Sequence, residues 1–340
     1  MSVITIVGAG MMGSAMSMPA RDNGHEVRLV GIHNRETIDS VNSSLYHPTM
    51  KRYLPEGVKA YHIDSLEEAI SDADLIICGV NSFGVDWFAD NVVPIVPENI
   101  PVLSITKGMV NGENGELIPY PVYMKQRSGR EDISINAVGG PCTSYELADR
   151  QNTIVAFCGE DIEVLRKIKA MLETEYYHIN LTDDIIGLEC AVAMKNAYAL
   201  AVSLTVGLNE KVNGEGAKQY YNPQAGIFLQ STREAMRMME IMGARMEILP
   251  FFTGDLYVTI FGGRTRLVGT LLGRGYTYEE AMEQLKGITL ESIVIASRAA
   301  KAVRELKRED EFPMLMHIDD VINNGAEVNI PWEKFEAEIV

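Results

Sequence analysis

A glycine-rich segment near the N-terminus constrains the fold of this chain more than any other feature of its sequence. The β-branched run at residues 2–7 is followed at once by GAGMMG at residues 8–13, and a stretch of helical character then continues to about Asn23. A second strand is expected at residues 26–30. A strand, a glycine loop, a helix and a second strand in this order predict a βαβ unit with parallel strands.

The spacing of the three glycines has a physical explanation. Gly8 permits the tight turn out of the strand, Gly10 lets the backbone approach a pyrophosphate, and Gly13 allows close packing of helix and strand. The first turn of the helix offers free N–H groups to phosphates. An ordinary turn before a packed helix is the alternative interpretation. The flanking strand and helix favour dinucleotide binding, with the candidate residues Gly8, Gly10, Met11, Met12 and Gly13.

A second signal that is typical of NAD-binding loops is missing. That signal is an Asp or Glu at the end of the second strand, which binds the ribose hydroxyls. Residues 30–35 read VGIHNR and contain no acid. Arg35 either meets the 2′-phosphate of NADP or is a solvated loop charge, and the sequence leaves both readings open. The expected cofactor is therefore NAD or NADP.

Strand and helix signals alternate along the first half of the chain. Further strands are expected at residues 75–80, 101–105, 133–138 and 153–157, and helices at residues 66–71, 86–93 and 163–173. Such alternation is typical of α/β domains. It predicts an N-terminal Rossmann domain over residues 1–182, with a doubly wound, mostly parallel sheet.

The character of the sequence changes near residue 182. From Asp184 to about Leu208 the chain is nearly continuously apolar and rich in alanine, which predicts a long buried helix behind the capping residues Thr182, Asp183 and Asp184. Helical patterns follow at residues 223–242, 278–285 and 292–306. Because single cores rarely grow past about 250–300 residues, we expect a second, all-helical substrate and catalytic domain at residues 183–340.

Composition excludes several classes of function. The formal net charge of −17 and the lack of a Lys/Arg cluster that would form a basic face argue against a nucleic-acid partner. Four cysteines without CxxC spacing predict neither a metal site nor disulfides. No apolar run approaches 18 residues, so no membrane span is expected. The strand-like residues 3–7 leave no room for a signal peptide, and a cytoplasmic location is expected.

Two lysines are candidates for proton transfer to and from an alcohol. Lys107 follows the predicted strand at residues 101–105, at an edge where ligands bind in α/β sheets. Lys195 lies on the long helix, where burial would remove its hydration and lower its pKa towards the range that suits proton transfer. A structural lysine that reaches the surface is the alternative. Its expected neighbours on the same helix face are apolar or nearly so: Leu188, Ala191, Val192, Tyr198, Ala199 and Val202.

A third candidate segment joins GDLYVT at residues 254–259 to FGGRTR at residues 261–266. Arg264 and Arg266 beside paired glycines predict a compact anion site, because guanidinium groups match phosphate oxygens. Asp255 is placed to orient a lysine amine by ion pairing. Solvated arginines in a loop that starts a helix are the alternative.

Taken together, these segments resemble the NAD(P)-dependent glycerol-3-phosphate dehydrogenase family. The resemblance covers residue 3 to about residue 310, with the motifs in family order and at family-like intervals. The tract FGGRTRLV at residues 261–268 is especially similar to the eukaryotic form of the family's arginine motif. The motifs are residues 8–13, Thr106-Lys107-Gly108, Gly140-Pro141 with Glu146, Lys195-Asn196, Gly254-Asp255-Leu256 with Thr259, and Gly263-Arg264.

The resemblance implies reversible conversion of dihydroxyacetone phosphate to sn-glycerol 3-phosphate by a homodimer. It makes Lys195 the general acid/base, with Lys107 and Asp255 positioning and polarising the reacting oxygen. Arg264 would hold a phosphate of the substrate or cofactor. The remaining implied substrate contacts are Asn196 and Thr259.

The chain departs from the family pattern at several positions that would line the substrate. Arg264 is followed by Thr265 where the family has an asparagine, and Cys142 follows Gly140-Pro141 where Ser or Asn is common. Residues 202–208 are less glycine-rich than in the family, and residues 209–221 look extended or altered. Thr265 and Cys142 are therefore added to the substrate-binding candidates.

These departures keep other functions open. One alternative is a dehydrogenase of another polyol phosphate. A second is an enzyme of the β-hydroxyacid or 6-phosphogluconate type, whose helical domain also holds a buried catalytic lysine. A third, from a different class, is a nucleotide sensor without catalytic activity.

Overall fold

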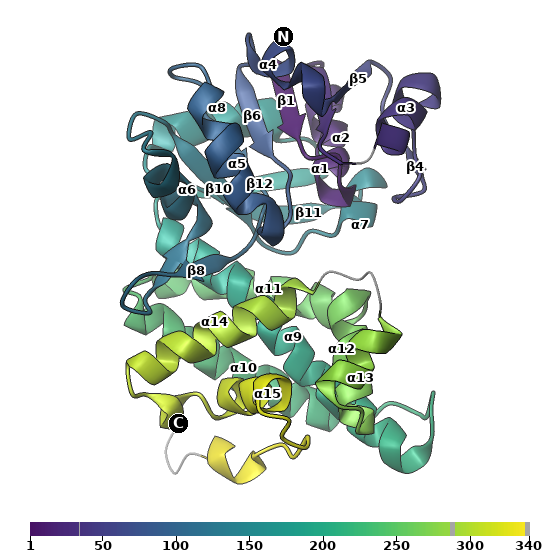
Figure 1. Cartoon of the computed structure of the whole chain (residues 1–340), viewed down its shortest axis with the longest axis vertical. Helices are drawn as coiled ribbons and strands as arrows, with labels where there is room; N and C mark the ends of the chain where they lie inside the picture. The colour runs from purple at the N-terminus through teal and green to yellow at the C-terminus, as the bar shows by residue number, and fades with distance from the viewer. Residues whose placement is uncertain (34, 286–289, 337–340) are drawn as a thin grey trace. The chain divides into compact units, whose positions relative to one another are not determined.

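The computed structural model describes residues 1–33, 35–285 and 290–336, which form two compact units (Figure 1). The sheet unit comprises Met1–Lys107 and Pro119–Glu189. The helical unit comprises Gly108–Ile118 and Cys190–Val340. Its short segment Gly108–Ile118 lies, in sequence, inside the half that was predicted to form the Rossmann domain. A division by sequence position alone, such as the predicted one at residue 182, does not separate this segment.

An eight-stranded sheet forms the first unit, in the order β12-β11-β10-β7-β6-β1-β2-β5. All neighbouring strands are parallel except the pair β10–β11. The strands β5 to β10 have the order 3-2-1-4-5-6 that is typical of dinucleotide-binding domains, which confirms the predicted mostly parallel sheet. The strands are β1 (Val3–Val7), β2 (Glu26–Gly31), β5 (Val58–His62), β6 (Leu75–Cys78), β7 (Val102–Ser104), β10 (Ile135–Gly139), β11 (Thr153–Cys158) and β12 (Tyr177–Thr182).

The two strands at the edges of the sheet, β5 and β12, were not predicted from the sequence. Each has only one strand neighbour, and exposed residues interrupt the buried ones along it, including Lys59 in β5 and His178 in β12. The central strands β1 and β6 are apolar and almost entirely buried. The apolar runs that identified the central strands are therefore absent at the edges.

Helices pack on both sides of this sheet (Figure 1). The helix predicted to continue unbroken to Asn23 is divided at Met16 into two. Pro19 explains the break, because it has no N–H to donate to the carbonyl of Ala15, four residues earlier. The helices are α1 (Met11–Ala15), α2 (Ser17–Asp22), α3 (Arg35–Ser44), α4 (Leu66–Ile70), α5 (Val85–Asn91), α6 (Tyr120–Ser128), α7 (Ser144–Ala148) and α8 (Ile162–Leu172).

The long helix α9 (Ile185–Asn213) begins where the sequence predicted, since Asp184 Oδ1 accepts a hydrogen bond of 2.8 Å from the N–H of Gly187. It is long and apolar enough to cross a membrane, so the expectation that no apolar run reaches such a length is wrong. However, 89% of its most apolar 18-residue window is buried inside the molecule. Burial of this extent is typical of a helix in the core of a folded unit.

The described part of the helical unit also contains six further α-helices and a short hairpin. The hairpin of β8 (Met109–Asn111) and β9 (Leu117–Pro119) is bound to α14: Asn111 donates to the carbonyl of Arg298, and Arg298 donates 2.7 Å to that of Met109. The helices α11, α12 and α15 were not predicted. The helices are α10 (Tyr221–Ile241), α11 (Leu249–Ile260), α12 (Gly263–Arg274), α13 (Tyr278–Gln284), α14 (Glu291–Glu305) and α15 (Pro313–Asn323).

Helices α9 and α12 cross at glycines. A Cβ at Gly207 would lie 2.1 Å from the carbonyl oxygen of Thr270, and one at Gly273 would lie 2.2 Å from that of Leu204. Gly207 belongs to the stretch that is less glycine-rich than in the resembled family, yet it stands where the two backbones meet. This crossing fixes α12, whose first turn carries Arg264.

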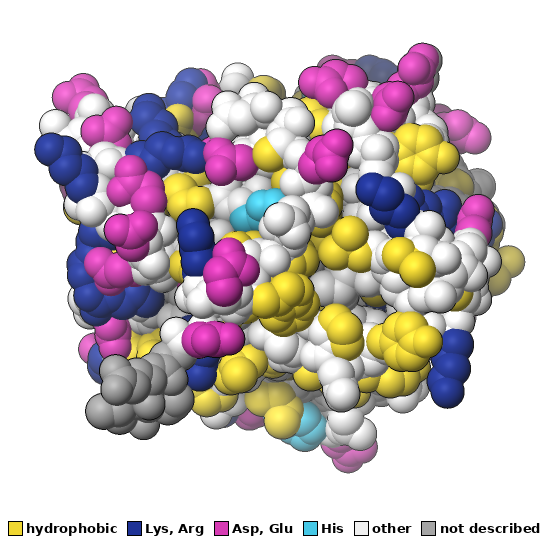
Figure 2. All heavy atoms as spheres, turned by 90° about the horizontal axis from the view of Figure 1, so that it is seen from below, with side chains coloured by type: hydrophobic (Ala, Val, Ile, Leu, Met, Phe, Trp, Pro, Cys, Tyr) yellow, Lys and Arg dark blue, Asp and Glu magenta, His cyan; other side chains and the backbone are white. Residues whose placement is uncertain are grey.

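Charged side chains of both signs lie on the surface of the molecule. On the face shown in Figure 2, basic side chains are interspersed with acidic ones, and apolar side chains gather towards its middle. No extended basic patch appears among the described residues on that face.

Candidate active site

The glycine loop joins β1 to α1, and two of its glycines are required by packing. Gly8 has a φ of +119°, and a Cβ there would lie 2.5 Å from the carbonyl carbon of Gly79. A Cβ at Gly13 would lie 2.2 Å from the carbonyl oxygen of Gly8. Both contacts are shorter than real Cβ atoms allow, so the loop, α1 and the end of β6 fit together only without side chains.

Gly10 differs from its neighbours because nothing within the protein requires it to be glycine. Its φ is −78°, and the nearest atom to a Cβ there would be the carbonyl oxygen of Gly79 at 3.9 Å. The residue is exposed at the N-cap of α1, beside half-buried Met11 and Met12. A molecule that approaches this backbone closely from outside would account for the glycine.

Two residues that support this loop were missed by sequence reasoning. Gly79, which follows β6, meets both Gly8 and Gly13 without a side chain of its own. Buried His47 accepts from the N–H of Met50 through Nδ1, so Nε2 donates to the carbonyl of Ala9 at 3.2 Å. Burial lowers the pKa of His47, which favours this neutral form. Gly79 could have been recognised by its place after an apolar strand, whereas His47 carries no pattern in the sequence.

Arg35 lies at the start of α3, shortly after the end of β2 at Gly31. Its side chain is exposed and forms an ion pair of 2.7 Å with Asp64, which is also exposed. An arginine held in this way at the surface is compatible with both readings of the sequence.

Lys107 and Cys142 lie beyond two neighbouring parallel strands, β7 and β10. The Nζ of Lys107 donates to the carbonyl of Gly140 at 3.0 Å, so the two loops are joined. Cys142 is half-buried and packs against the apolar core of the sheet unit. Lys107 thus lies at the carboxyl edge of the sheet, as its sequence position predicted.

Lys195 is buried on α9, with 9% of its surface exposed. Its Nζ donates to Asp255 Oδ1 at 3.0 Å and to Thr259 Oγ1 at 2.8 Å. Thr259 donates its own proton to the backbone carbonyl of Asp255 at 2.7 Å, so its oxygen faces Lys195 as an acceptor. The side chain is thus largely buried, unlike that of a lysine that extends to the surface.

This arrangement brings together three predicted site residues from two helices. Lys195 comes from α9, while Asp255 and Thr259 are one turn apart on α11. The carboxyl group of Asp255 is even more buried than the amine, at 1% exposure. A buried charge is tolerated only when it is paired and hydrogen-bonded, so the positions of these three side chains are closely constrained.

The arginine segment differs from the expected paired site. Arg266 donates to the carbonyl of Ile260 at 2.6 Å and so binds the end of α11. Arg264 is exposed on the first turn of α12, beside half-buried Thr265. Asn196 is half-buried on α9, next to Lys195. Of the two arginines at the start of α12, only Arg264 is therefore exposed.

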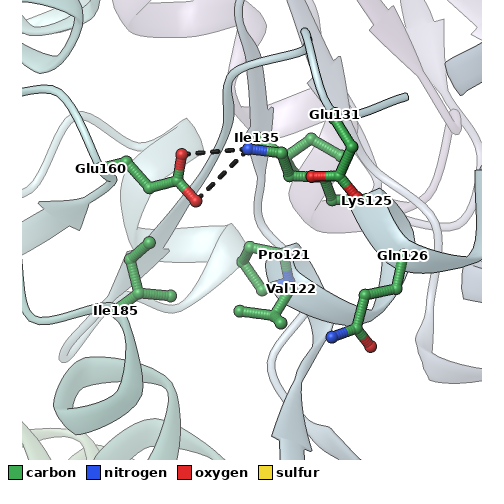
Figure 3. A pocket seen from close by; sticks show the side chains of 8 residues that line it. All are labelled: Pro121, Val122, Lys125, Gln126, Glu131, Ile135, Glu160 and Ile185. Atoms are coloured by element: carbon green, nitrogen blue, oxygen red, sulfur yellow. Dashed lines mark hydrogen bonds and ion pairs between the residues drawn. The ribbon is translucent and has the colours of Figure 1, made fainter. Parts of the chain in front are cut away.

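A pocket elsewhere in the sheet unit contains none of the predicted site residues. It encloses about 180 Å³. Lys125 faces Glu160 there across 3.1 Å (Figure 3). The other lining residues are Pro121, Val122, Gln126, Glu131, Ile135 and Ile185.

Comparison with known proteins identifies the family. Residues 3–165 match the family model of the N-terminus of NAD-dependent glycerol-3-phosphate dehydrogenase, and residues 184–333 match the model of its C-terminus. The chain belongs to the glycerol-3-phosphate dehydrogenase family. Its members are NAD(P)-dependent oxidoreductases, so the predicted family, enzyme class and cofactor type are confirmed.

Similar proteins from other organisms agree with this assignment. The chain is 33% identical over 288 residues to NADP(+)-dependent glycerol-3-phosphate dehydrogenase of Archaeoglobus fulgidus, with 84% of each chain covered. It is 30% identical over 338 residues to glycerol-3-phosphate dehydrogenase [NAD(P)+] of Bacillus cereus, covering 96% of this chain and 93% of that one. Its fold is similar to that of glycerol-3-phosphate dehydrogenase from Coxiella burnetii, with a TM-score of 0.82 and 21% sequence identity. The match covers 98% of this chain and 97% of that one.

Proposed function

We propose that this glycerol-3-phosphate dehydrogenase family member interconverts sn-glycerol 3-phosphate and dihydroxyacetone phosphate, with NAD or NADP as the hydride carrier. The observation that carries the proposal is the buried amine of Lys195, held by Asp255 and Thr259. Oxidation of a secondary alcohol needs a group that removes the hydroxyl proton and can return it. Lys195 is the candidate for that group.

The partners of Lys195 determine how the amine is oriented. Asp255 supplies a negative charge at 3.0 Å, and Thr259 supplies a second acceptor at 2.8 Å. Two fixed acceptors limit the rotation of the amine and so set its orientation. Lys107 is proposed to polarise the reacting oxygen, and Arg264 to bind the phosphate, because a guanidinium fork matches phosphate oxygens.

The dinucleotide is proposed to bind at the glycine loop, where it would supply or accept the hydride. Gly10 fits this role because its backbone is exposed and the protein itself does not require glycine there. The proposed contacts of the cofactor are with Gly8, Gly10, Met11, Met12, Gly13, Lys107, Arg264 and, near the ribose, Arg35.

Gly10→Ala separates cofactor binding from folding. The added methyl has room within the protein, so thermal stability should change little, while the dissociation constant for NADH or NADPH rises by about 10-fold or more because the methyl blocks the close approach of a phosphate. Binding is measured by nicotinamide fluorescence without substrate. Gly13→Ala is the matched control, and it should lower stability because its methyl meets Gly8. Unchanged cofactor affinity in Gly10→Ala would contradict this binding site.

A substrate panel tests the reaction itself. Turnover is followed by NADH and NADPH absorbance with glycerol 3-phosphate, with other polyol phosphates and with unphosphorylated β-hydroxy acids. We expect the highest kcat/KM with glycerol 3-phosphate. Activity on unphosphorylated hydroxy acids alone would overturn the proposal, as would cofactor binding without any turnover, which identifies a sensor. If another polyol phosphate is preferred, the next variants restore the family residues, Asn in place of Thr265 and Ser in place of Cys142.

We also propose that the protein is a homodimer located in the cytoplasm. Large apolar side chains are exposed along α10, among them Tyr221 and Leu229, and a second copy would cover such residues. No disulfide joins Cys78, Cys142, Cys158 and Cys190, which suits a reducing compartment. Sedimentation analysis of the purified chain and cell fractionation test these two points.

A further inference from the structure

A second buried carboxyl group lies in the helical unit, and the proposed chemistry does not use it. Glu234 on α10 is 1% exposed and accepts four hydrogen bonds. Oε1 accepts from Gln230 at 2.9 Å and from the N–H of Met314 at 2.8 Å. Oε2 accepts from Tyr198 Oη and from the N–H of Leu315, both at 3.0 Å. A carboxylate that receives four donors is fully satisfied as an anion.

Two of these donors belong to the first turn of α15. The N-cap residue of that helix, Phe312, has no side chain that can accept a hydrogen bond, so the N–H groups of Met314 and Leu315 need a partner from elsewhere. Glu234 is that partner, and its charge also suits the positive end of the helix. One role of Glu234 is therefore to cap α15 from α10.

The hydrogen bond from Tyr198 also connects Glu234 to the part of α9 that carries Lys195. Tyr198 lies on α9 three residues after Lys195, and its ring packs edge-on against Phe252, with the centroids 6.0 Å apart and the planes at 85°. Phe252 lies on α11 three residues before Asp255. The ring pair therefore spans the same two helices as the Lys195–Asp255 ion pair, one helical turn away.

We propose that Glu234 is a positioning residue for the Lys195–Asp255–Thr259 cluster, an inference that rests on the proposed function. By holding the hydroxyl of Tyr198, Glu234 fixes the plane of the ring that separates α9 from α11. The spacing of these helices sets the distance from Lys195 to Asp255. Glu234 acts through Tyr198 and touches neither substrate nor cofactor.

Tyr198→Phe distinguishes positioning from simple capping of α15. This variant removes the hydroxyl bond to Glu234 but keeps the ring and both N–H bonds of the cap. If Glu234 is only a cap, Tyr198→Phe leaves kcat unchanged. If Glu234 positions Lys195, Tyr198→Phe and Glu234→Gln both lower kcat, and the KM for the cofactor stays the same.

The experiment measures kcat and both KM values for the full chain and its variants, with glycerol 3-phosphate. We expect kcat to fall about 10-fold in Glu234→Gln and Tyr198→Phe, since small misplacements of a catalytic group are costly. Asp319→Asn is the matched control: Asp319 is also a buried carboxylate, on α15, but its partners are Arg304 and Asn323. It should leave kcat within about two-fold.

Other outcomes are also decisive. Unchanged kcat in Tyr198→Phe overturns the proposal, and this variant decides the question if Glu234→Gln does not fold. If the wild-type chain shows no turnover, the proposed function fails, and crystal structures then test the positioning role. The distance of 3.0 Å from Lys195 Nζ to Asp255 should lengthen in Tyr198→Phe but not in Asp319→Asn, and an unchanged distance contradicts the proposal.

Discussion

Each unit of the molecule holds a lysine–carboxylate ion pair of nearly the same length, but the two pairs differ in burial. Lys195 and Asp255 in the helical unit are 3.0 Å apart, with side-chain exposures of 11% and 1%. Lys125 and Glu160 in the sheet unit are 3.1 Å apart, with exposures of 19% and 66%. The distance between the charged atoms therefore does not distinguish a candidate catalytic pair from a surface pair.

The difference lies in what surrounds the charges. Lys195 has a second fixed acceptor in Thr259, whose proton is committed to the backbone, and Asp255 is almost fully shielded from water. Glu160 is largely solvated, so water and salt weaken its attraction to Lys125. A hollow next to an ion pair, as in Figure 3, does not by itself make an active site.

The largest expected effect is the loss of turnover in Lys195→Met. Removal of the group that exchanges the substrate proton should lower kcat by about 1,000-fold, within the range for general acid–base catalysis. Cofactor affinity should be unchanged, because the glycine loop lies in the other unit. Lys125→Met is the matched control and should keep full activity. The comparison breaks down if the two variants lose activity equally.

The next largest effect is expected on stability in Asp255→Asn. This change leaves the amine of Lys195 buried without its negative partner, and breaking a buried pair in this way costs about 3–5 kcal/mol. The free energy of unfolding is measured by urea denaturation at neutral pH. A loss below about 1 kcal/mol is the size expected for a surface pair. Such a result would show that the buried pair stabilises the fold no more than a surface pair does.

A pH dependence of stability should follow from Glu234. Burial raises its pKa from 4.5 to about 7, so the folded chain binds this proton more tightly than the unfolded chain does. The resulting stabilisation is complete below pH 4.5 and is lost as the pH rises through about 7. Unfolding free energies between pH 4.5 and 7.5 should therefore show a decline that is reduced in Glu234→Gln. An identical slope in the variant would contradict the raised pKa.

The smallest effect is expected in Glu160→Gln. An exposed ion pair contributes about 0–1 kcal/mol, so the free energy of unfolding should change by no more than that, and kcat should not change. The measurement is sharpest at low ionic strength, where surface charges are least screened. A loss comparable to that of Asp255→Asn would remove the distinction between the two pairs.

The sequence predicted the parts of the fold that have strong periodic signals. The glycine loop, the apolar central strands and the helix α9 were visible because burial on all sides leaves a continuous apolar pattern. The strand β5, with exposed Lys59, and the helix α12, with Gly269 and Gly273 on its buried face, lack that pattern. The break in the first helix depends on Pro19, whose effect was not anticipated.

The candidate site was predictable only in part, for a similar reason. Lys195 was identified by its apolar neighbours along one helix, which is local information. Its contact with Asp255, 60 residues away, was suggested only by chemistry and resemblance. His47 and Glu234 went unrecognised because their roles arise from partners on other elements, and no spacing in the sequence records such contacts.

The most direct test is a crystal structure of the wild-type chain with reduced cofactor and a bound substrate analogue that carries the phosphate. The measured quantity is the distance from Lys195 Nζ to the oxygen on the secondary carbon of the analogue. We predict a hydrogen bond of about 2.6–3.2 Å, with the Lys195–Asp255 contact retained. A Lys195 amine beyond reach of that oxygen, with another residue or only water in contact with it, would contradict the assignment.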